Sequence, residues 1–214
     1  MTTVYFVRHG ETTANASRIF QGISDFPLSP KGIAQGKLLQ KRFAQVPYDH
    51  IFSSPLSRAV DTAKILNEGH PCSVEILPIL IEVDGGVLEG EPFATIAERF
   101  PKQLDLYENH HLDFVGEGAT DGGVRGAWER VQQICRMLPE QYPEQTVVLV
   151  AHGAVLRSFN CFIQGFPFEK LPEVPWGDNT CVTCVRLFPD RKPEPVYIND
   201  ASHVTSDLAT KDVW

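Results

Sequence analysis

The sequence predicts an α/β fold, a three-layer sandwich in which helices flank both faces of a mostly parallel central sheet. Short apolar runs alternate with amphipathic stretches along the chain, which is typical of strands connected by helices. One run, TVVLVA at 146–151, is apolar enough for a strand buried on both faces. At 214 residues and 43% hydrophobic content, the chain can bury a sizeable core. We therefore expect one domain over residues 1–214.

The strands follow from the apolar runs. The parallel part of the sheet is predicted to use residues 3–7, 50–53, 74–77 and 146–151. Near the end of the chain, CVTCVRLF and PVYIND flank a charged, proline-rich turn, which predicts a terminal hairpin or edge pair. Because an edge strand can pair with another copy, we expect a homodimer to form there if one forms at all.

The helices follow from apolar residues at helical spacing, and they are predicted over residues 30–46, 55–66, 124–138 and 153–164. Ser29-Pro30 offers an N-cap and a first-turn proline for the first helix, and Ser54-Pro55 repeats that signal for the second. Residues 91–121 are the least regular part of the sequence and hold aromatic residues among prolines, acids and glycines. We expect a lid-like insertion there, over one end of the sheet.

Charge and composition exclude several classes of function. The net charge is −8 and no stretch resembles a basic face, so affinity for nucleic acid or an anionic membrane is not expected. No apolar run is long enough to cross a bilayer, and the amino terminus does not resemble a signal peptide. These features predict a cytoplasmic protein in which any bound anion is held by a local site.

The cysteines are odd in number and lie mostly in apolar segments, which predicts free thiols in a reducing compartment; they are Cys72, Cys135, Cys161, Cys181 and Cys184. Cys181 and Cys184 form a CxxC, but no second pair accompanies it. Because alternation along a strand would turn the two side chains to opposite faces, we favour packing over zinc or redox chemistry. His110 and His111 lack a third ligand at suitable spacing, so no metal site is expected.

Basic side chains gather where strands are predicted to end. The first strand runs into Arg8 and His9, and His152 ends the run at 146–151 just before a glycine and a helix. Ligands of α/β sheets bind beyond the carboxyl ends of the strands. If these two strands are neighbours, both imidazoles face one crevice.

Arg58 falls in the first turn of its predicted helix, where the helix dipole disfavours a cation unless an anion binds there. Arginine forks also favour phosphate oxygens. Each feature has a simpler explanation when it is taken alone: Arg58 could pair with Asp61 one turn away, and His152 could bond to backbone. Together with Arg8 and His9, however, these residues predict a cationic pocket for a phosphoryl group.

Four blocks carry a family resemblance: RHGET at 8–12, SSPLSRAVDTA at 53–63, IEVDGGVLEG at 81–90 and VVLVAHGAVLR at 147–157. In this order they resemble the histidine phosphatase superfamily, also called the phosphoglycerate mutase-like family. The resemblance implies a phosphoglycerate mutase-like fold and a histidine acid phosphatase-type enzyme that uses a phosphohistidine intermediate. The chemistry it implies needs no metal and no cofactor.

The resemblance also implies roles for individual residues. His9 would be the nucleophile, while Arg8, Arg58 and His152 would hold the phosphoryl oxygens. Glu82 would be the general acid and then the general base. Further contacts to the substrate would come from Asn15, Gln21, Gly22 and Gly153. By motif position, Glu82 is favoured over its neighbouring acids Glu75, Asp84, Glu89 and Glu91.

The function implied is hydrolysis of a small phosphorylated metabolite. The segment between Glu82 and His152 is shorter than in the cofactor-dependent mutases, which favours the phosphatase branch over a phosphoglycerate mutase, an isomerase. A third hypothesis is a phosphoryl-ligand binding protein that has lost turnover. Its usual mark would be a missing nucleophile or acid, and the sequence has both.

Overall fold

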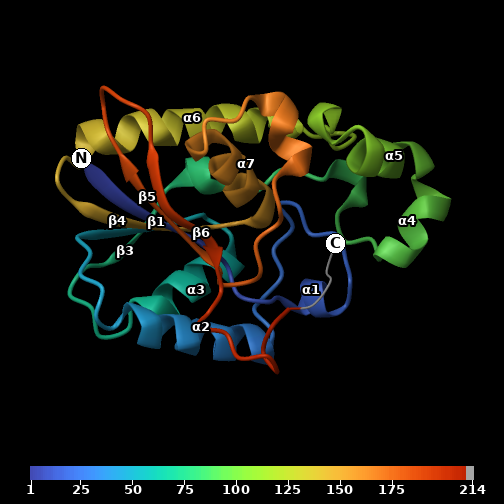
Figure 1. The fold of residues 1–214 in the computed structure, drawn as a ribbon. Coiled ribbons are helices and arrows are strands. Elements are labelled where there is room, and N and C mark those ends of the chain that lie inside the picture. The colour runs from blue at the N-terminus through green and yellow to red at the C-terminus, as the bar shows by residue number, and fades with distance from the viewer. Residues whose placement is uncertain (211–214) are drawn as a thin grey trace.

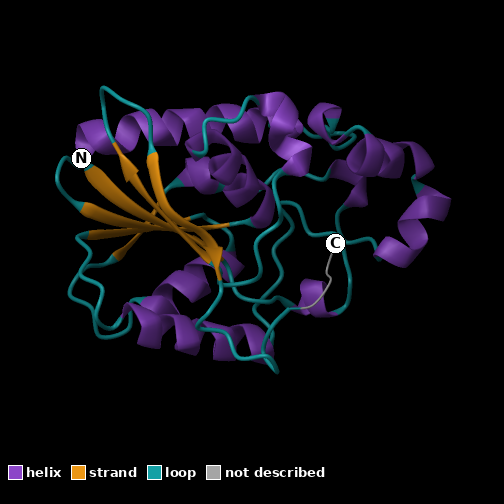
Figure 2. Ribbon diagram, in the orientation of Figure 1, coloured by secondary structure: helices purple, strands orange, loops and turns teal. Residues whose placement is uncertain are grey.

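The computed structural model describes residues 1–210 as helices packed on both faces of one sheet (Figures 1 and 2). The sheet has six strands in the order β3-β2-β4-β1-β5-β6. Their bounds are β1 Thr2–Arg8, β2 His50–Ser53, β3 Val74–Ile76, β4 Thr146–Ala151, β5 Val182–Leu187 and β6 Glu194–Asp200. This arrangement confirms the predicted α/β class and places β4 and β1 at the centre of the sheet.

The sheet is parallel except at one edge. β4 pairs in parallel with both β1 and β2, and β2 pairs in parallel with β3. β5 and β6 run antiparallel and form the terminal edge pair that the sequence predicts. Because β1 and β4 are neighbours, the strand ends that carry His9 and His152 lie side by side.

Helices cover the two faces of the sheet and extend past one of its ends (Figure 1). Their bounds are α1 Thr13–Ala16, α2 Pro30–Phe43, α3 Ser57–Leu66, α4 Phe93–Arg99, α5 Pro101–Asn109, α6 Gly123–Gln141 and α7 Gly153–Ile163. Alternate side chains of β4 face opposite layers of helices. Val148 and Val150 pack with α2 and α3, whereas Val147 and Leu149 pack with α6 and α7. This burial on both faces explains why the strand is apolar throughout.

One predicted helix start is wrong. Ser29 caps α2 as expected, since its hydroxyl accepts a hydrogen bond from the Gly32 amide at 3.0 Å. Ser54, in contrast, lies before the second helix, because α3 begins at Ser57 after Leu56, which makes no side-chain cap. The Ser54 hydroxyl is instead 2.6 Å from Nε2 of His152, a partner distant in sequence that cap rules do not consider. The first helix also ends early, at Phe43 rather than at residue 46.

Residues 91–121 are more regular than expected. They form α4, α5 and a 3₁₀ turn at His111–Asp113, and they lie beyond the carboxyl ends of the parallel strands (Figure 1). Prolines suggested an irregular segment, but Pro92 immediately precedes α4 and Pro101 is the first residue of α5. Proline is tolerated at these positions because the first helical amides have no intrahelical acceptor.

All five cysteines are free thiols. Cys181 packs in the cluster beneath α6 and α7, whereas Cys184 contacts Tyr5 on the opposite face. The predicted placement of the CxxC side chains on opposite faces is therefore confirmed. Within residues 1–210, no helix is both long and apolar enough to cross a bilayer.

Candidate active site

The pocket that contains the predicted basic residues lies where β1 and β4 end. Arg8 is the last residue of β1 and pairs in register with Ala151 of β4. The His9 amide then donates to the Ala151 carbonyl at 2.9 Å, which fixes the chain beyond the strand. The imidazole rings of His9 and His152 have centroids 5.2 Å apart. Two distant parts of the sequence therefore meet in one place, as predicted.

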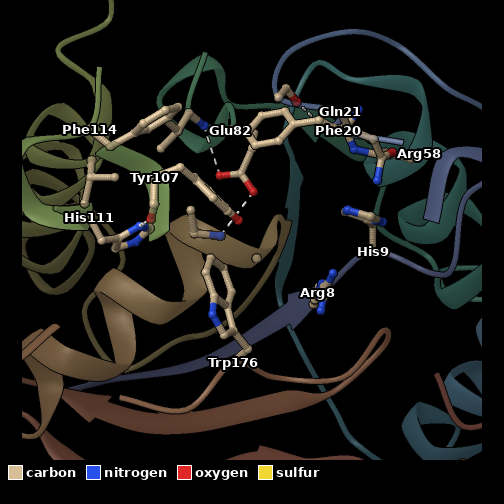
Figure 3. Close-up of a pocket in the computed structure, with 15 residues that line it drawn as sticks. Arg8, His9, Phe20, Gln21, Arg58, Glu82, Tyr107, His111, Phe114 and Trp176 are labelled. Atoms are coloured by element: carbon tan, nitrogen blue, oxygen red, sulfur yellow. Dashed lines mark hydrogen bonds between the residues drawn. The ribbon is translucent and has the colours of Figure 1, made fainter. Parts of the chain in front are cut away.

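The structure fixes the tautomer of His9. Its Nδ1 lies 2.7 Å from the Gly10 carbonyl oxygen, which can only accept, so Nδ1 carries the hydrogen and donates it. Nε2 consequently keeps its lone pair, with the ring facing the pocket (Figure 3). Burial, followed by the charges of Arg58 and Arg8, lowers the pKa of His9 well below its usual value. His9 is thus a neutral imidazole near pH 7, the form that acts as a nucleophile.

Arg58 joins three parts of the site. Its guanidinium donates to the Gly22 carbonyl at 2.6 Å and the Ser24 carbonyl at 2.8 Å, and its Nε donates to Nδ1 of His152 at 3.2 Å. Burial lowers its pKa to about 10, so it stays cationic at neutral pH. Arg58 is not paired with Asp61 among the contacts of the described residues. The simpler explanation of this arginine is therefore wrong.

His152 lies behind the pocket rather than in its wall. Because its Nδ1 accepts from Arg58, Nε2 carries the hydrogen and donates to the Ser54 hydroxyl at 2.6 Å. The ring is fully buried and is not among the residues that line the pocket. Burial, followed by the charge of Arg58, lowers the pKa of His152 well below its usual value. In this structure His152 orients Arg58 through a neutral ring.

Arg8 supplies the second cation. It is 2% exposed, lines the pocket and donates from Nη1 to the Gly177 carbonyl. Burial lowers its pKa. Two guanidinium groups beside a neutral imidazole make this a site for an anion with several oxygens.

Glu82 faces the same cavity (Figure 3). Its two carboxylate oxygens accept from the amides of Val83 at 3.0 Å and Ala154 at 3.1 Å, which fix its position. Of the five acids at 75, 82, 84, 89 and 91, Glu82 is the one that lines the pocket.

The competing acids are occupied elsewhere. Glu89 accepts from the amides of Ile23, Ser24 and Gly85, and so ties the loop below Arg58 to the loop after Glu82. Glu91 pairs with Arg99. These partners support the choice of Glu82 that motif position favours.

Three of the four predicted substrate contacts line the pocket. They are Gln21, Gly22 and Gly153. Gly22 needs to be glycine, because its φ is +54° and a Cβ there would lie 2.0 Å from Oε1 of Glu89. Asn15 does not line the pocket: its Oδ1 accepts from the Thr12 amide at 3.1 Å in a capping box at the start of α1.

The opposite wall of the pocket is aromatic, and motif analysis did not assign it. It consists of Phe20, Tyr107, His111, Phe114 and Trp176 (Figure 3). The aromatic content of residues 91–121 is a signal that suggests such a wall for three of these five residues. Phe20 and Trp176 had no signal in the sequence.

Within residues 1–210, no group of three or more histidine, cysteine or acidic side chains is placed to hold a metal ion. His110 pairs with Asp105 at 3.7 Å, whereas His111 faces the pocket.

The two buried imidazoles predict a loss of stability in acid. His9 and His152 resist protonation when folded but bind protons near pH 6.5 when unfolded, so the unfolded state gains more protons as the pH falls. Together they should reduce the free energy of unfolding by about 2 kcal/mol between pH 6.5 and 5.5. Urea unfolding at each pH measures this change. His9→Ala should remove about half of this contribution, and an unchanged pH dependence in that variant would contradict it.

Comparison with known proteins agrees with this geometry. The family model described as histidine phosphatase superfamily (branch 1) matches residues 4–201. The chain is 33% identical over 172 residues to a probable phosphoglycerate mutase GpmB of Proteus mirabilis, covering 78% of this chain and 77% of that protein. It is 29% identical over 172 residues to phosphoserine phosphatase 1 of Hydrogenobacter thermophilus, covering 79% of this chain and 80% of that protein.

A solved structure supports the same assignment. YhfR of Bacillus stearothermophilus superposes with a TM-score of 0.85 at 28% sequence identity, covering 95% of this chain and 99% of that chain. This similarity extends over the helices beyond the strand ends as well as the sheet.

Proposed function

The chain belongs to branch 1 of the histidine phosphatase superfamily, and from that premise we propose that it hydrolyses a phosphomonoester of a small metabolite through a phosphohistidine on His9. Enzymes of this superfamily are phosphatases or mutase-like. The observation that carries the proposal is the neutral His9, with Nδ1 tied to Gly10 and Nε2 free to attack beside two buried arginines.

The first step transfers the phosphoryl group to the enzyme. Nε2 of His9 attacks phosphorus, forming the N–P bond as the ester P–O bond breaks on the opposite side. Arg8 and Arg58 stabilise the charge on the equatorial oxygens. Glu82, in its protonated form, gives its proton to the departing oxygen, which leaves as an alcohol. His152 contributes by holding Arg58 in position.

The second step regenerates the enzyme. The Glu82 carboxylate takes a proton from water as the water oxygen attacks phosphorus. The N–P bond breaks, inorganic phosphate is released, and His9 returns to its neutral form. Gln21, Gly22 and Gly153 are proposed as further substrate contacts, whereas Asn15 would act indirectly through Thr12, which also bonds to Gln21 at 2.8 Å.

Phosphate release tests the proposal. The purified protein should release inorganic phosphate from p-nitrophenyl phosphate in the presence of a metal chelator, and His9→Ala should not. Equal rates for the two proteins would refute the proposal.

A phosphoglycerate mutase is the second candidate, because the relative from Proteus mirabilis is named a probable one. A mutase must retain a bisphosphorylated intermediate, which requires a closed site that excludes water. Incubation with 3-phosphoglycerate separates the two functions. We expect free phosphate or no reaction, whereas conversion to 2-phosphoglycerate would support the mutase.

Replacing Glu82 by glutamine should affect substrates unequally. Glu82→Gln keeps the size of the side chain and one of the two backbone hydrogen bonds, because its amide has a single acceptor oxygen, and it removes the proton donor. We therefore expect kcat for an alkyl phosphate to fall by about 10²- to 10⁴-fold. With p-nitrophenyl phosphate, whose leaving group needs no proton, the first step should be much less affected. Steady-state and burst kinetics on both substrates measure the difference, and Glu75→Gln is the matched control. An equal loss on both substrates in the burst phase would contradict the acid role.

We also propose that residues 91–121 act as a lid within a single domain of residues 1–214. Tyr107, His111 and Phe114 from this segment line the pocket, which supports the proposal. A homodimer through the β6 edge and a cytoplasmic location stay predictions from the sequence.

A further inference from the structure

The pocket has two halves of different chemistry, with Glu82 between them (Figure 3). His9 and the two arginines form the inner half, where the proposed function places the phosphoryl group. The aromatic wall forms the outer half: Tyr107, His111 and Phe114 lie on the side of the cavity opposite His9, whereas Trp176 borders the inner half near Arg8 (Figure 3). Because the ester bond must break on the side away from the attacking nitrogen and near Glu82, the leaving group would occupy this outer half.

The outer half offers no cation to a negatively charged leaving group. Among the described residues that line the pocket, the arginines are Arg8 and Arg58, and the proposed function places both on the phosphoryl oxygens. His111 is the titratable base of the outer wall; burial, then the charge of Arg157, lowers its pKa to about 4. It is therefore neutral at pH 7. A carboxylate placed here would lose its hydrating water without gaining a cation.

Arg157 is close to this wall but is already used. Its Nε donates to the Val174 carbonyl at 2.7 Å and its Nη2 to the Pro172 carbonyl at 2.8 Å. Its guanidinium stacks on the ring of Trp176 at 4.5 Å and does not line the pocket. Arg157 therefore supports Trp176 in the wall instead of presenting a charge to the substrate.

The rings of the aromatic wall pack against one another. Tyr107 contacts Phe20, Phe114 and His111 edge to face, with ring centroids 5.2, 5.3 and 5.7 Å apart. The ring of His111 in turn meets that of Trp176 at 6.0 Å. Rings fixed by one another lose little freedom when a further ring packs on them, and aromatic pairs gain attraction beyond the area they bury.

Resting on the proposed function, we infer that the outer half of the pocket selects leaving groups that carry an uncharged aromatic ring and rejects those that carry a carboxylate. The substrate class is thus an aromatic phosphomonoester rather than a phosphorylated hydroxy or amino acid. Tyr107 and Trp176 are the residues that would determine this specificity.

Equilibrium binding to the His9→Ala variant tests the inference without turnover. Two ligands are matched in their linker and primary ester, 3-phenylpropyl phosphate and 3-carboxypropyl phosphate. Calorimetry should give a Kd at least about 30-fold lower for the phenyl ligand, which is the gain expected from burying a ring of this size. Equal or tighter binding of the carboxypropyl ligand would overturn the inference.

Further variants test whether the aromatic wall causes the preference for the phenyl ligand. Added to His9→Ala, Trp176→Ala should reduce the ratio of the two Kd values about tenfold. Phe166→Ala removes an aromatic ring that is 44% exposed and outside the pocket, and should leave the ratio within about twofold. Tyr107→Leu, which keeps an apolar side chain but removes the ring, is a second test that should also lower the ratio. Unchanged ratios in folded Trp176→Ala and Tyr107→Leu proteins, as judged by circular dichroism, would contradict the assignment.

The two proposals can fail separately. If the wild-type protein hydrolyses neither ester but the His9→Ala variant prefers the phenyl ligand, the hydrolase is refuted and the aromatic subsite stands. If the wild-type protein hydrolyses the carboxypropyl ester better, the hydrolase stands and the subsite is refuted.

Discussion

His9→Ala is expected to lower kcat for phosphate release by about 10⁴-fold or more. Alanine removes the only atom proposed to bond covalently to phosphorus. The neighbouring imidazole of His152 cannot replace it as the nucleophile, because both of its nitrogens are engaged by Arg58 and Ser54. Phosphate release from p-nitrophenyl phosphate measures the change.

The control is a histidine replaced outside the pocket. His110→Ala removes an exposed imidazole from the end of α5 and should keep kcat within about twofold. The nucleophilic role of His9 would be contradicted if the His9→Ala protein, shown to be folded, kept more than about one hundredth of the wild-type rate.

Arg58→Ala is expected to lower kcat/KM by about 10³-fold. The change removes a cation from the half of the pocket proposed to bind the phosphoryl group, and it also removes the hydrogen bonds that the guanidinium donates to the carbonyls of Gly22 and Ser24. Nδ1 of His152 loses its donor as well, so the free energy of unfolding should fall by about 1–3 kcal/mol. Steady-state kinetics and urea unfolding measure the two effects.

Two further variants separate charge from geometry. Arg58→Lys keeps the charge but not the fork that reaches three acceptors, so it should recover only part of the lost activity. Arg136→Ala, at an exposed position of α6, should leave both quantities nearly unchanged. A fully active Arg58→Lys would show that the bonds to Gly22, Ser24 and His152 are not needed.

The sequence predicts most of the fold because strands that are buried in the sheet appear in the sequence as short apolar runs. β2 and β4 have the predicted bounds: β2 ends at Ser53, and β4 ends at Ala151, just before His152. The errors arise where a long-range contact overrides a local rule. Ser54 has the residue type and spacing of a helix cap, but its hydroxyl bonds to His152, 98 positions away. Local reasoning cannot detect such a partner.

In the candidate site, too, some features could be predicted from local sequence and others depend on long-range contacts. The chemistry-bearing residues gather as predicted because motifs at strand ends meet when the strands are neighbours; those that line the pocket are Arg8, His9, Arg58 and Glu82. The position of His152 behind Arg58 could not be predicted, since it depends on ring orientation rather than on strand register. Phe20 and Trp176 reach the pocket from segments with no periodic or motif signal.

The central claim is that His9 carries the phosphoryl group between the two steps. Rapid acid-free quenching of the Glu82→Gln variant during turnover of p-nitrophenyl phosphate, followed by proteolysis and mass spectrometry, tests it most directly. We expect one phosphorylated peptide, containing His9, whose modification is lost in acid and survives in base. A phosphoryl group on another residue, or rapid phosphate release with no phosphorylated peptide at any quench time, would contradict the account.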